Sequence, residues 1–267
     1  MIIMKLYHYT NLASAIGIIQ PKRKLCFWGS RYDCMNDPFD FQFSNNRFLP
    51  PTIEAAKEIG MQDSEIEEVM VHPFIVSFSR HADDFLMWRL YNAKICLVLE
   101  SEYFDRNTPN VALIECEYIN DTAKERQDAF TAIDKKIDYC RNVYANVGRI
   151  STFIKNSAFQ VEGEVRLATW DYYNSHGDTL CLPDCKDSNP IVEKNFYSRM
   201  NTNGYITLYK KFNIDGNALD GIIVHSYSEI EFEPIKNALR SILIQNGFSH
   251  DVFSNIKPTS VYPFNLH

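Results

Sequence analysis

Hydrophobic and polar residues alternate along several short stretches of the chain, which is the pattern of a β-strand with one buried face. The alternation is clearest over 74–79, where Phe74, Val76 and Phe78 share one side and an isoleucine and two serines share the other. Further strands are predicted over 5–9, 25–28, 112–117, 161–167, 205–209 and 221–224, and the apolar run over 95–99 predicts one more.

Apolar residues spaced by three and four positions predict the helices between these strands. A short helix follows Thr10 or Asn11, either of which can cap its N-terminus. Pro50 and Pro51 open a helical insertion that we expect over 50–72. The other predicted helices span 84–92, 122–156 and 231–245, and the second of these is a long amphipathic helix.

The order of the predicted elements indicates the fold class. Strands and helices do not alternate regularly as βαβ units, and no glycine-rich phosphate loop follows any predicted strand. A doubly wound nucleotide-binding fold is therefore disfavoured. The sequence predicts an α+β fold with mixed, mainly antiparallel sheets flanked by helices. We expect a single domain over 1–267, because no repeat, low-complexity tract or linker interrupts the chain.

Composition and charge narrow the classes of function. With 45% hydrophobic residues the chain can bury a substantial core. Its formal net charge of -7 opposes the attraction to phosphate backbones on which most nucleic-acid-binding proteins depend. The sequence therefore disfavours a purely electrostatic nucleic-acid binder, although a locally positive site stays open. Three short basic clusters are interpreted as solvated surface, and they lie at 22–24, 135–136 and 210–211.

The cysteines and the hydropathy pattern bear on compartment and metal binding. Seven cysteines without a repeated spacing fit reduced thiols, so we expect a cytoplasmic protein. No apolar run is long enough to span a membrane, and no membrane partner is expected. Cys181 and Cys185, with His176 nearby, suggest a metal site only weakly, because no second ligand pair is visible. We therefore predict no metal.

Four stretches contain most of the residues that could perform chemistry. In chain order they are Tyr7-His8-Tyr9-Thr10-Asn11, Asn36-Asp37-Pro38-Phe39, Ser77-Phe78-Ser79 followed by Trp88-Arg89-x-Tyr91, and Glu162-Gly163-Glu164-Val165-Arg166. In this order they resemble the successive signatures of the bacterial domain-of-unknown-function family 2971. The resemblance implies an ADP-ribosyltransferase-like split β core that uses NAD as a substrate.

The resemblance also implies a role for each residue. Cleavage of the nicotinamide glycosidic bond passes through an oxocarbenium-like state that a carboxylate stabilises, and Glu164 is expected to do this. Glu162, expected on the same face of the same strand, would orient or deprotonate the acceptor. His8 would hydrogen-bond a ribose hydroxyl. The other residues expected to bind NAD are Tyr9, Thr10, Ser77, Ser79, Trp88, Tyr91 and Arg166.

Each assignment has a structural alternative. Trp88 and Tyr91 lie three positions apart on a predicted helix, a spacing that also fits core packing. His8 could be a structural histidine on the first strand. If Arg166 pairs with Glu164 instead of facing a pyrophosphate, the carboxylate is neutralised and its catalytic role weakens.

Two functional hypotheses follow. The first is an NAD-utilising ADP-ribosyltransferase-like enzyme of bacterial stress, toxin or phage defence, which modifies a protein or nucleic-acid acceptor. The second is a non-catalytic module on the same fold that binds a nucleotide or a protein partner. Binding of NAD without turnover, unchanged by Glu164→Gln, separates the second hypothesis from the first.

Overall fold

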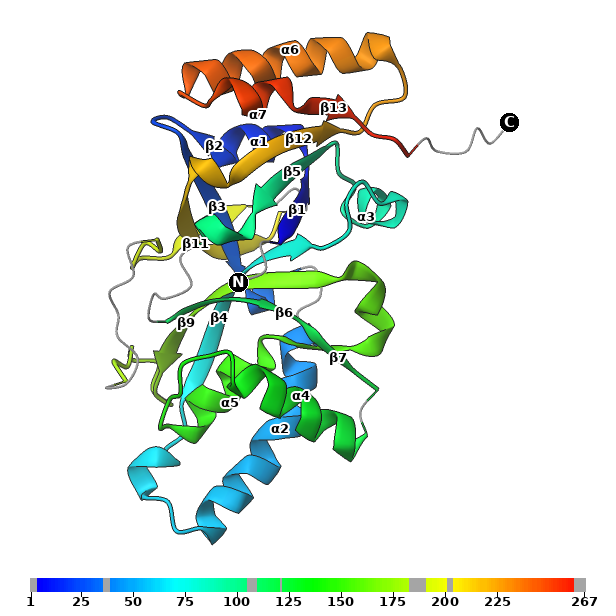
Figure 1. Ribbon diagram of the computed structural model, residues 1–267. Coiled ribbons are helices and arrows are strands. Elements are labelled where there is room, and N and C mark those ends of the chain that lie inside the picture. The colour runs from blue at the N-terminus through cyan, green and yellow to red at the C-terminus, as the bar shows by residue number, and fades with distance from the viewer. Residues whose placement is uncertain are drawn as a thin grey trace. The chain divides into compact units, whose positions relative to one another are not determined.

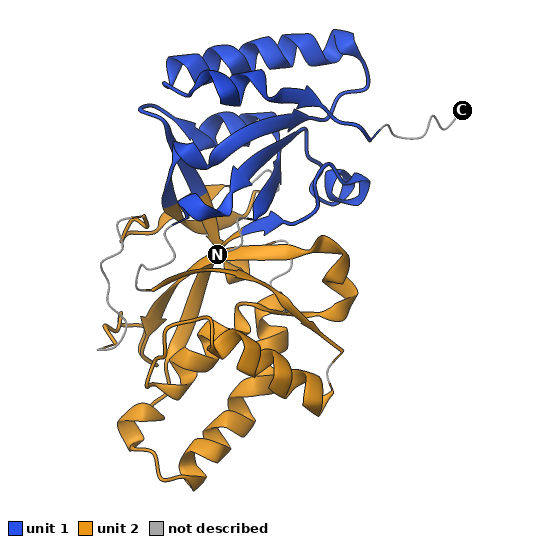
Figure 2. Cartoon of the chain, in the orientation of Figure 1, with its two compact units in different colours: residues 1–27, 77–105, 212–267 blue, residues 28–76, 106–211 orange. Residues whose placement is uncertain are grey.

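The computed structural model describes residues 4–35, 39–104, 110–120, 122–182, 191–200 and 204–261. It has an α+β fold in which most strand pairs are antiparallel and helices flank the sheets (Figure 1). This confirms the predicted fold class at that level. The chain forms two compact units, which are unit 1 (residues 1–27, 77–105 and 212–267) and unit 2 (residues 28–76 and 106–211) (Figure 2).

Unit 1 contains the predicted first strand, β1 (Lys5–Thr10). It pairs antiparallel with β5 (Ile95–Glu100) over its whole length. Strand β5 pairs with β12 (Leu219–Val224), and β13 (Ile256–Pro258) runs parallel to β12. All these strands except β13 were predicted, because each alternates or forms a short apolar run.

The helices of unit 1 are α1 (Leu12–Ile18), α3 (Phe85–Leu90), α6 (Glu229–Gln245) and α7 (His250–Ser254). Asn11 caps α1, because its side chain accepts a hydrogen bond of 2.8 Å from the Ser14 N–H. Helices α6 and α7 pack on each other, and both contact β12 (Figure 1). The sequence therefore predicted three of these four helices.

Unit 2 is built around several antiparallel pairs and one parallel pair. Strand β6 (Val111–Glu115) pairs with β9 (Glu164–Tyr173), and β10 (Tyr197–Met200) pairs with β11 (Ile206–Asp215). Unit 2 also contains the parallel pair β7 (Glu117–Ile119) and β8 (Ile154–Asn156).

Three strands cross the unit boundaries. They are β3 (Lys24–Arg31), β4 (Met70–Ser79) and β11. The short strand β2 (Ile19–Gln20) belongs to unit 1.

The predicted long helix over 122–156 is wrong. The structure has two helices, α4 (Ala123–Asp134) and α5 (Val143–Ser151), with non-helical chain between them. The Asn142 side chain accepts a hydrogen bond of 3.0 Å from the Ala145 N–H and starts α5 anew. An asparagine cap of this kind competes with helix continuation, and the three-four spacing of apolar residues did not reveal it.

The helical insertion expected over 50–72 is also wrong in its bounds. Helix α2 (Phe39–Glu58) begins well before the two prolines, and the chain re-enters β4 at Met70. Prolines inside a helix remove backbone hydrogen bonds. Here burial of one helix face compensates, because Phe48 is in the core of unit 2 and the buried Ser44 hydroxyl hydrogen-bonds two carbonyls outside the helix.

Gly216 lies where a side chain has no room. A Cβ atom at this position would be 2.4 Å from the backbone oxygen of Arg23, to which the Gly216 N–H already donates a hydrogen bond of 3.0 Å. We expect Gly216→Ala to lower the free energy of unfolding by about 1–3 kcal/mol, measured by urea denaturation.

Gly17 of α1 provides the control, because among the described residues no atom beyond its chain neighbours and its own helix backbone lies within 4 Å of its Cβ position. Gly17→Ala should be neutral or stabilise by up to about 1 kcal/mol. Equal stability of the Gly216→Ala protein and the wild type would show that the Arg23 backbone can move aside.

Candidate functional site

The residues predicted to bind and cleave NAD belong to both units. Unit 1 contains the predicted ligand-binding residues from His8 to Tyr91, and unit 2 contains Glu162, Glu164 and Arg166. That His8, Ser77 and Glu164 share one pocket therefore stays a prediction. The structure does define the surroundings of each group.

His8 lies on β1 and is held by its own unit. Its Nδ1 lies 3.0 Å from the backbone oxygen of Ser77, and its ring meets Phe27 edge-on at 5.2 Å. A carbonyl can only accept, so Nδ1 carries the proton and Nε2 is left as an acceptor. Burial lowers the pKa of His8, which keeps the ring neutral. A neutral imidazole that accepts through Nε2 fits the predicted hydrogen bond with a ribose hydroxyl, and it fits a purely structural histidine equally well.

Tyr9 and Trp88 form part of the core of unit 1. Their rings meet edge-on at 4.9 Å, and only 6% and 2% of the two residues are exposed. The Tyr9 hydroxyl donates to the backbone oxygen of His81 at 2.6 Å, and the Trp88 indole N–H donates to Asp83 at 2.9 Å. These contacts favour the core-packing alternative stated for Trp88, and they place Tyr9 in the core as well. Tyr91 stacks on Tyr9 at 6.4 Å but stays partly exposed.

Strand geometry separates His8 from these aromatic rings. Successive side chains of a strand point to opposite faces, so His8 and Thr10 share one face of β1 and Tyr9 takes the other. Neither Tyr9 nor Trp88 can therefore stack on a base held directly over His8.

Ser79 is buried, and its hydroxyl accepts a hydrogen bond of 3.0 Å from the His81 N–H.

The expected strand face shared by Glu162 and Glu164 is wrong. Glu162 ends a 3-10 helix, Gly163 adopts a left-handed conformation with φ 49°, and β9 starts only at Glu164. The turn nevertheless brings both carboxylates to Lys155 of β8. The Lys155 Nζ lies 2.8 Å from the Glu162 carboxylate and 2.7 Å from that of Glu164.

Arg166 pairs with Glu164 inside unit 2. Its Nε and Nη2 lie 3.0 Å from the two carboxylate oxygens of Glu164, so the pair is bidentate. Arg166 also donates to the backbone oxygen of Thr152 at 2.7 Å and forms an ion pair with Asp40. Only 2% of Glu164 and 1% of Arg166 are exposed. We call Asp40, Lys155, Glu162, Glu164 and Arg166 the buried charge cluster.

The charges in this cluster fix the protonation state of Glu164. Burial alone raises the pKa of a carboxyl, but the Arg166 and Lys155 charges outweigh it and lower the pKa of Glu164 to about 2. A carboxyl with a lowered pKa stabilises the fold above its unfolded value, near 4.5, and this contribution is lost as the pH falls toward 2. Glu164 is thus ionised, and the positive charges of Arg166 and Lys155 balance its negative charge.

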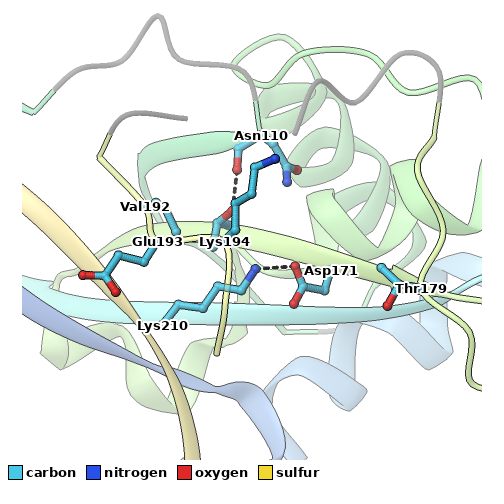
Figure 3. A pocket seen from close by; sticks show the side chains of 8 residues that line it. Asn110, Asp171, Thr179, Val192, Glu193, Lys194 and Lys210 are labelled. Atoms are coloured by element: carbon cyan, nitrogen blue, oxygen red, sulfur yellow. Dashed lines mark hydrogen bonds and ion pairs between the residues drawn. The ribbon is translucent and has the colours of Figure 1, made fainter. Parts of the chain in front are cut away.

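Unit 2 also has a pocket beside β9 and β11 (Figure 3). The pocket is lined by Asn110, Thr169, Asp171, Thr179, Val192, Glu193, Lys194 and Lys210. The Lys210 ammonium forms an ion pair with Asp171 (Figure 3). The Thr169 hydroxyl donates to the Asn110 backbone oxygen at 2.7 Å. The pocket therefore offers two ammonium groups together with hydroxyl and carboxylate oxygens.

The size of the pocket limits what it can hold. Its volume is about 190 Å³, less than the roughly 300–1,000 Å³ of most small-molecule sites. It can take a phosphate or a phosphorylated sugar but not a whole dinucleotide. Sequence reasoning missed it, because its residues are scattered over five separate stretches without a common spacing.

Comparisons of the chain with protein-family models, with curated proteins and with solved structures found no match. In the described parts of the chain, no three His, Cys, Asp or Glu residues are grouped as metal ligands. Asn36-Asp37-Pro38 and Cys185 lie outside the described residues. Within the same described ranges, no helix has both the length and the apolar character of a membrane span.

Removal of the Glu164 charge should destabilise unit 2. In the Glu164→Gln protein Arg166 and Lys155 lose their shared carboxylate in a buried site, and breaking such a pair costs about 3–5 kcal/mol. We expect a loss of this size in urea denaturation at neutral pH.

Glu58→Gln is the matched control, since Glu58 is exposed at the end of α2. Its free energy of unfolding should stay within about 0.5 kcal/mol of the wild type. A Glu164→Gln protein as stable as the control would mean that the buried charge cluster does not hold the unit together.

Proposed function

We propose that this chain is a nucleotide-binding module that binds a ligand of the NAD or ADP-ribose type without cleaving it. The observation that carries the proposal is the state of Glu164, which is buried and bound by both Arg166 and Lys155. The residues that resemble family 2971 motivate the ligand class. We place the module in the bacterial cytoplasm on the sequence argument given above.

Cleavage of NAD requires a carboxylate that can reach the ribose. Glycosidic bond cleavage draws on a negative group beside the developing positive charge, and that group must contact the sugar. Glu164 has only 2% of its surface exposed, and its two oxygens already accept hydrogen bonds from two cations. This arrangement favours the binding module over the ADP-ribosyltransferase-like enzyme.

The pocket of unit 2 is where we place the ribose-phosphate part of the ligand. Lys194 is an exposed ammonium on its wall and supplies a point charge for a phosphate. The Thr179 hydroxyl and the carboxylate of Asp171 can bind sugar hydroxyls. Because the pocket is small, the base and the second half of a dinucleotide would extend outside it.

Calorimetry with NAD and with ADP-ribose tests the proposal. We expect both to bind to the wild type, and Lys194→Ala to weaken binding about tenfold through loss of a charge-assisted contact. Lys57→Ala, which removes an exposed lysine of α2, should bind as the wild type does. Chromatography of the same mixtures should detect no free nicotinamide.

Two outcomes contradict the proposal in different ways. Release of nicotinamide that Glu164→Gln abolishes, in a variant that is still folded, would establish the enzyme instead. Loss of binding in His8→Gln with full binding in Lys194→Ala would move the ligand from the pocket to β1.

A further inference from the structure

Three aromatic rings stack in a row on one face of unit 2. Trp28 of β3 stacks on Tyr209 of β11 at 4.8 Å and 23°, and Tyr209 stacks on Tyr197 of β10 at 5.6 Å and 28°. Tyr197 and Tyr209 are direct partners in the β10–β11 register, so the row crosses neighbouring strands. We call Trp28, Tyr197 and Tyr209, with the two cations described next, the aromatic platform.

Two cationic side chains lie over these rings. The Arg199 guanidinium is 5.2 Å from the centre of the Trp28 ring and 5.7 Å from that of Tyr209. The Lys211 ammonium is 4.1 Å from the centre of the Tyr197 ring and forms an ion pair of 3.8 Å with Glu193. Arg199 and Lys211 thus place positive charge beside a stack of π-faces.

The exposure of Trp28 distinguishes the platform from ordinary core packing. Trp28 is 42% exposed, whereas Trp88 and Trp170 are 2% and 1% exposed. A large aromatic ring on a strand is usually covered, and Trp28 at the end of the row is not. Trp28 therefore offers exposed aromatic surface to a ligand.

We propose that the aromatic platform binds a base of a single-stranded nucleic acid. Aromatic side chains on β-strands, with Arg and Lys beside them, are a known means of binding single-stranded nucleic acids. Every base has a π-face that can stack on such a ring, and every nucleotide has a phosphate that a cation can contact. Arg199 and Lys211 can contact the phosphates on either side of the stacked base. The net charge of -7 limits this site to a short stretch of strand, which the local cations of the platform attract.

The rings of the platform and the pocket in which we place the ribose-phosphate use opposite sides of β11, although Glu193, which lines the pocket, also pairs with Lys211 of the platform. Tyr209 and Lys210 are neighbours on β11, so their side chains point to opposite sides of the strand. Lys210 lines the pocket, and Tyr209 is the middle ring of the platform. Failure of NAD binding in the pocket would therefore leave this inference untouched.

The tryptophan emission of the protein reports on the platform directly. The chain has three tryptophans, and of these only Trp28 is exposed. We expect a thymidine dodecamer to quench the emission, and Trp28→Phe to abolish that response. A duplex of the same length and free AMP form the comparison arms, and both should act much more weakly than the single strand.

Anisotropy of a labelled thymidine dodecamer measures the affinity. Trp28→Ala should weaken binding about tenfold, since stacking of one base on an aromatic side chain is lost. Trp28→Phe keeps a smaller ring, so its affinity should lie between those of the wild type and the Trp28→Ala protein. Tyr139→Ala removes a 62% exposed tyrosine elsewhere in unit 2 and should leave binding unchanged.

Salt dependence tests the two cations. Contacts to two phosphates of a single strand predict a slope of about -1.4 in log K against log salt, and Arg199→Gln should reduce it to about -0.7. The proposal is overturned if the dodecamer does not bind at low salt, or binds equally well to Trp28→Ala. The proposal is also overturned if AMP binds as tightly as the dodecamer. Self-association that shields Trp28, with no effect of the oligonucleotide on the emission, would overturn it as well.

Discussion

The bidentate pair between Arg166 and Glu164 is the interaction on which unit 2 depends most. Two fully buried charges are costly to remove from water, and their attraction offsets the cost only when the remaining donors also find partners. Here they do, because Arg166 also bonds Thr152 and Asp40, and Glu164 also bonds Lys155. The cluster thereby connects the start of β9 to β8, to the end of α5 and to α2.

The carboxylates of Glu162 and Glu164 could have stabilised the fold and also contacted a substrate. The buried charge cluster uses them for the fold. The Glu164 carboxylate is ionised, but both of its oxygens already accept hydrogen bonds from cations, and only 2% of the residue is exposed to an approaching sugar. In the function that we propose, ligands bind to surfaces away from the cluster. In unit 2 these are the small pocket with Lys194 and the aromatic platform with Trp28, both of which have exposed polar or π surface. We therefore favour a binding module over an enzyme.

The sequence predicted most strands and short helices well, because each has a local signal such as the alternation over 74–79 or the cap at Asn11. It failed where long-range contacts decide the outcome. Helix α2 continues through two prolines, because one of its faces is buried. Asn142 starts the new helix α5 within a stretch whose apolar spacing predicted one continuous helix. The resemblance drew attention to Glu164, but nothing in the sequence marked Lys155 or Asp40 as its partners.

The ionisation of Glu164 tests the central claim most directly. A carbon-13 NMR titration of the Glu164 side-chain carboxyl, with the amide spectrum recorded in parallel to follow folding, measures its pKa in the native protein. The buried charge cluster predicts that the carboxyl stays ionised as the pH falls through its ordinary value of 4.5 and titrates near 2. A midpoint at or above 4.5 in the folded protein would contradict the pairing with Arg166 and Lys155, and would restore Glu164 as a candidate catalyst.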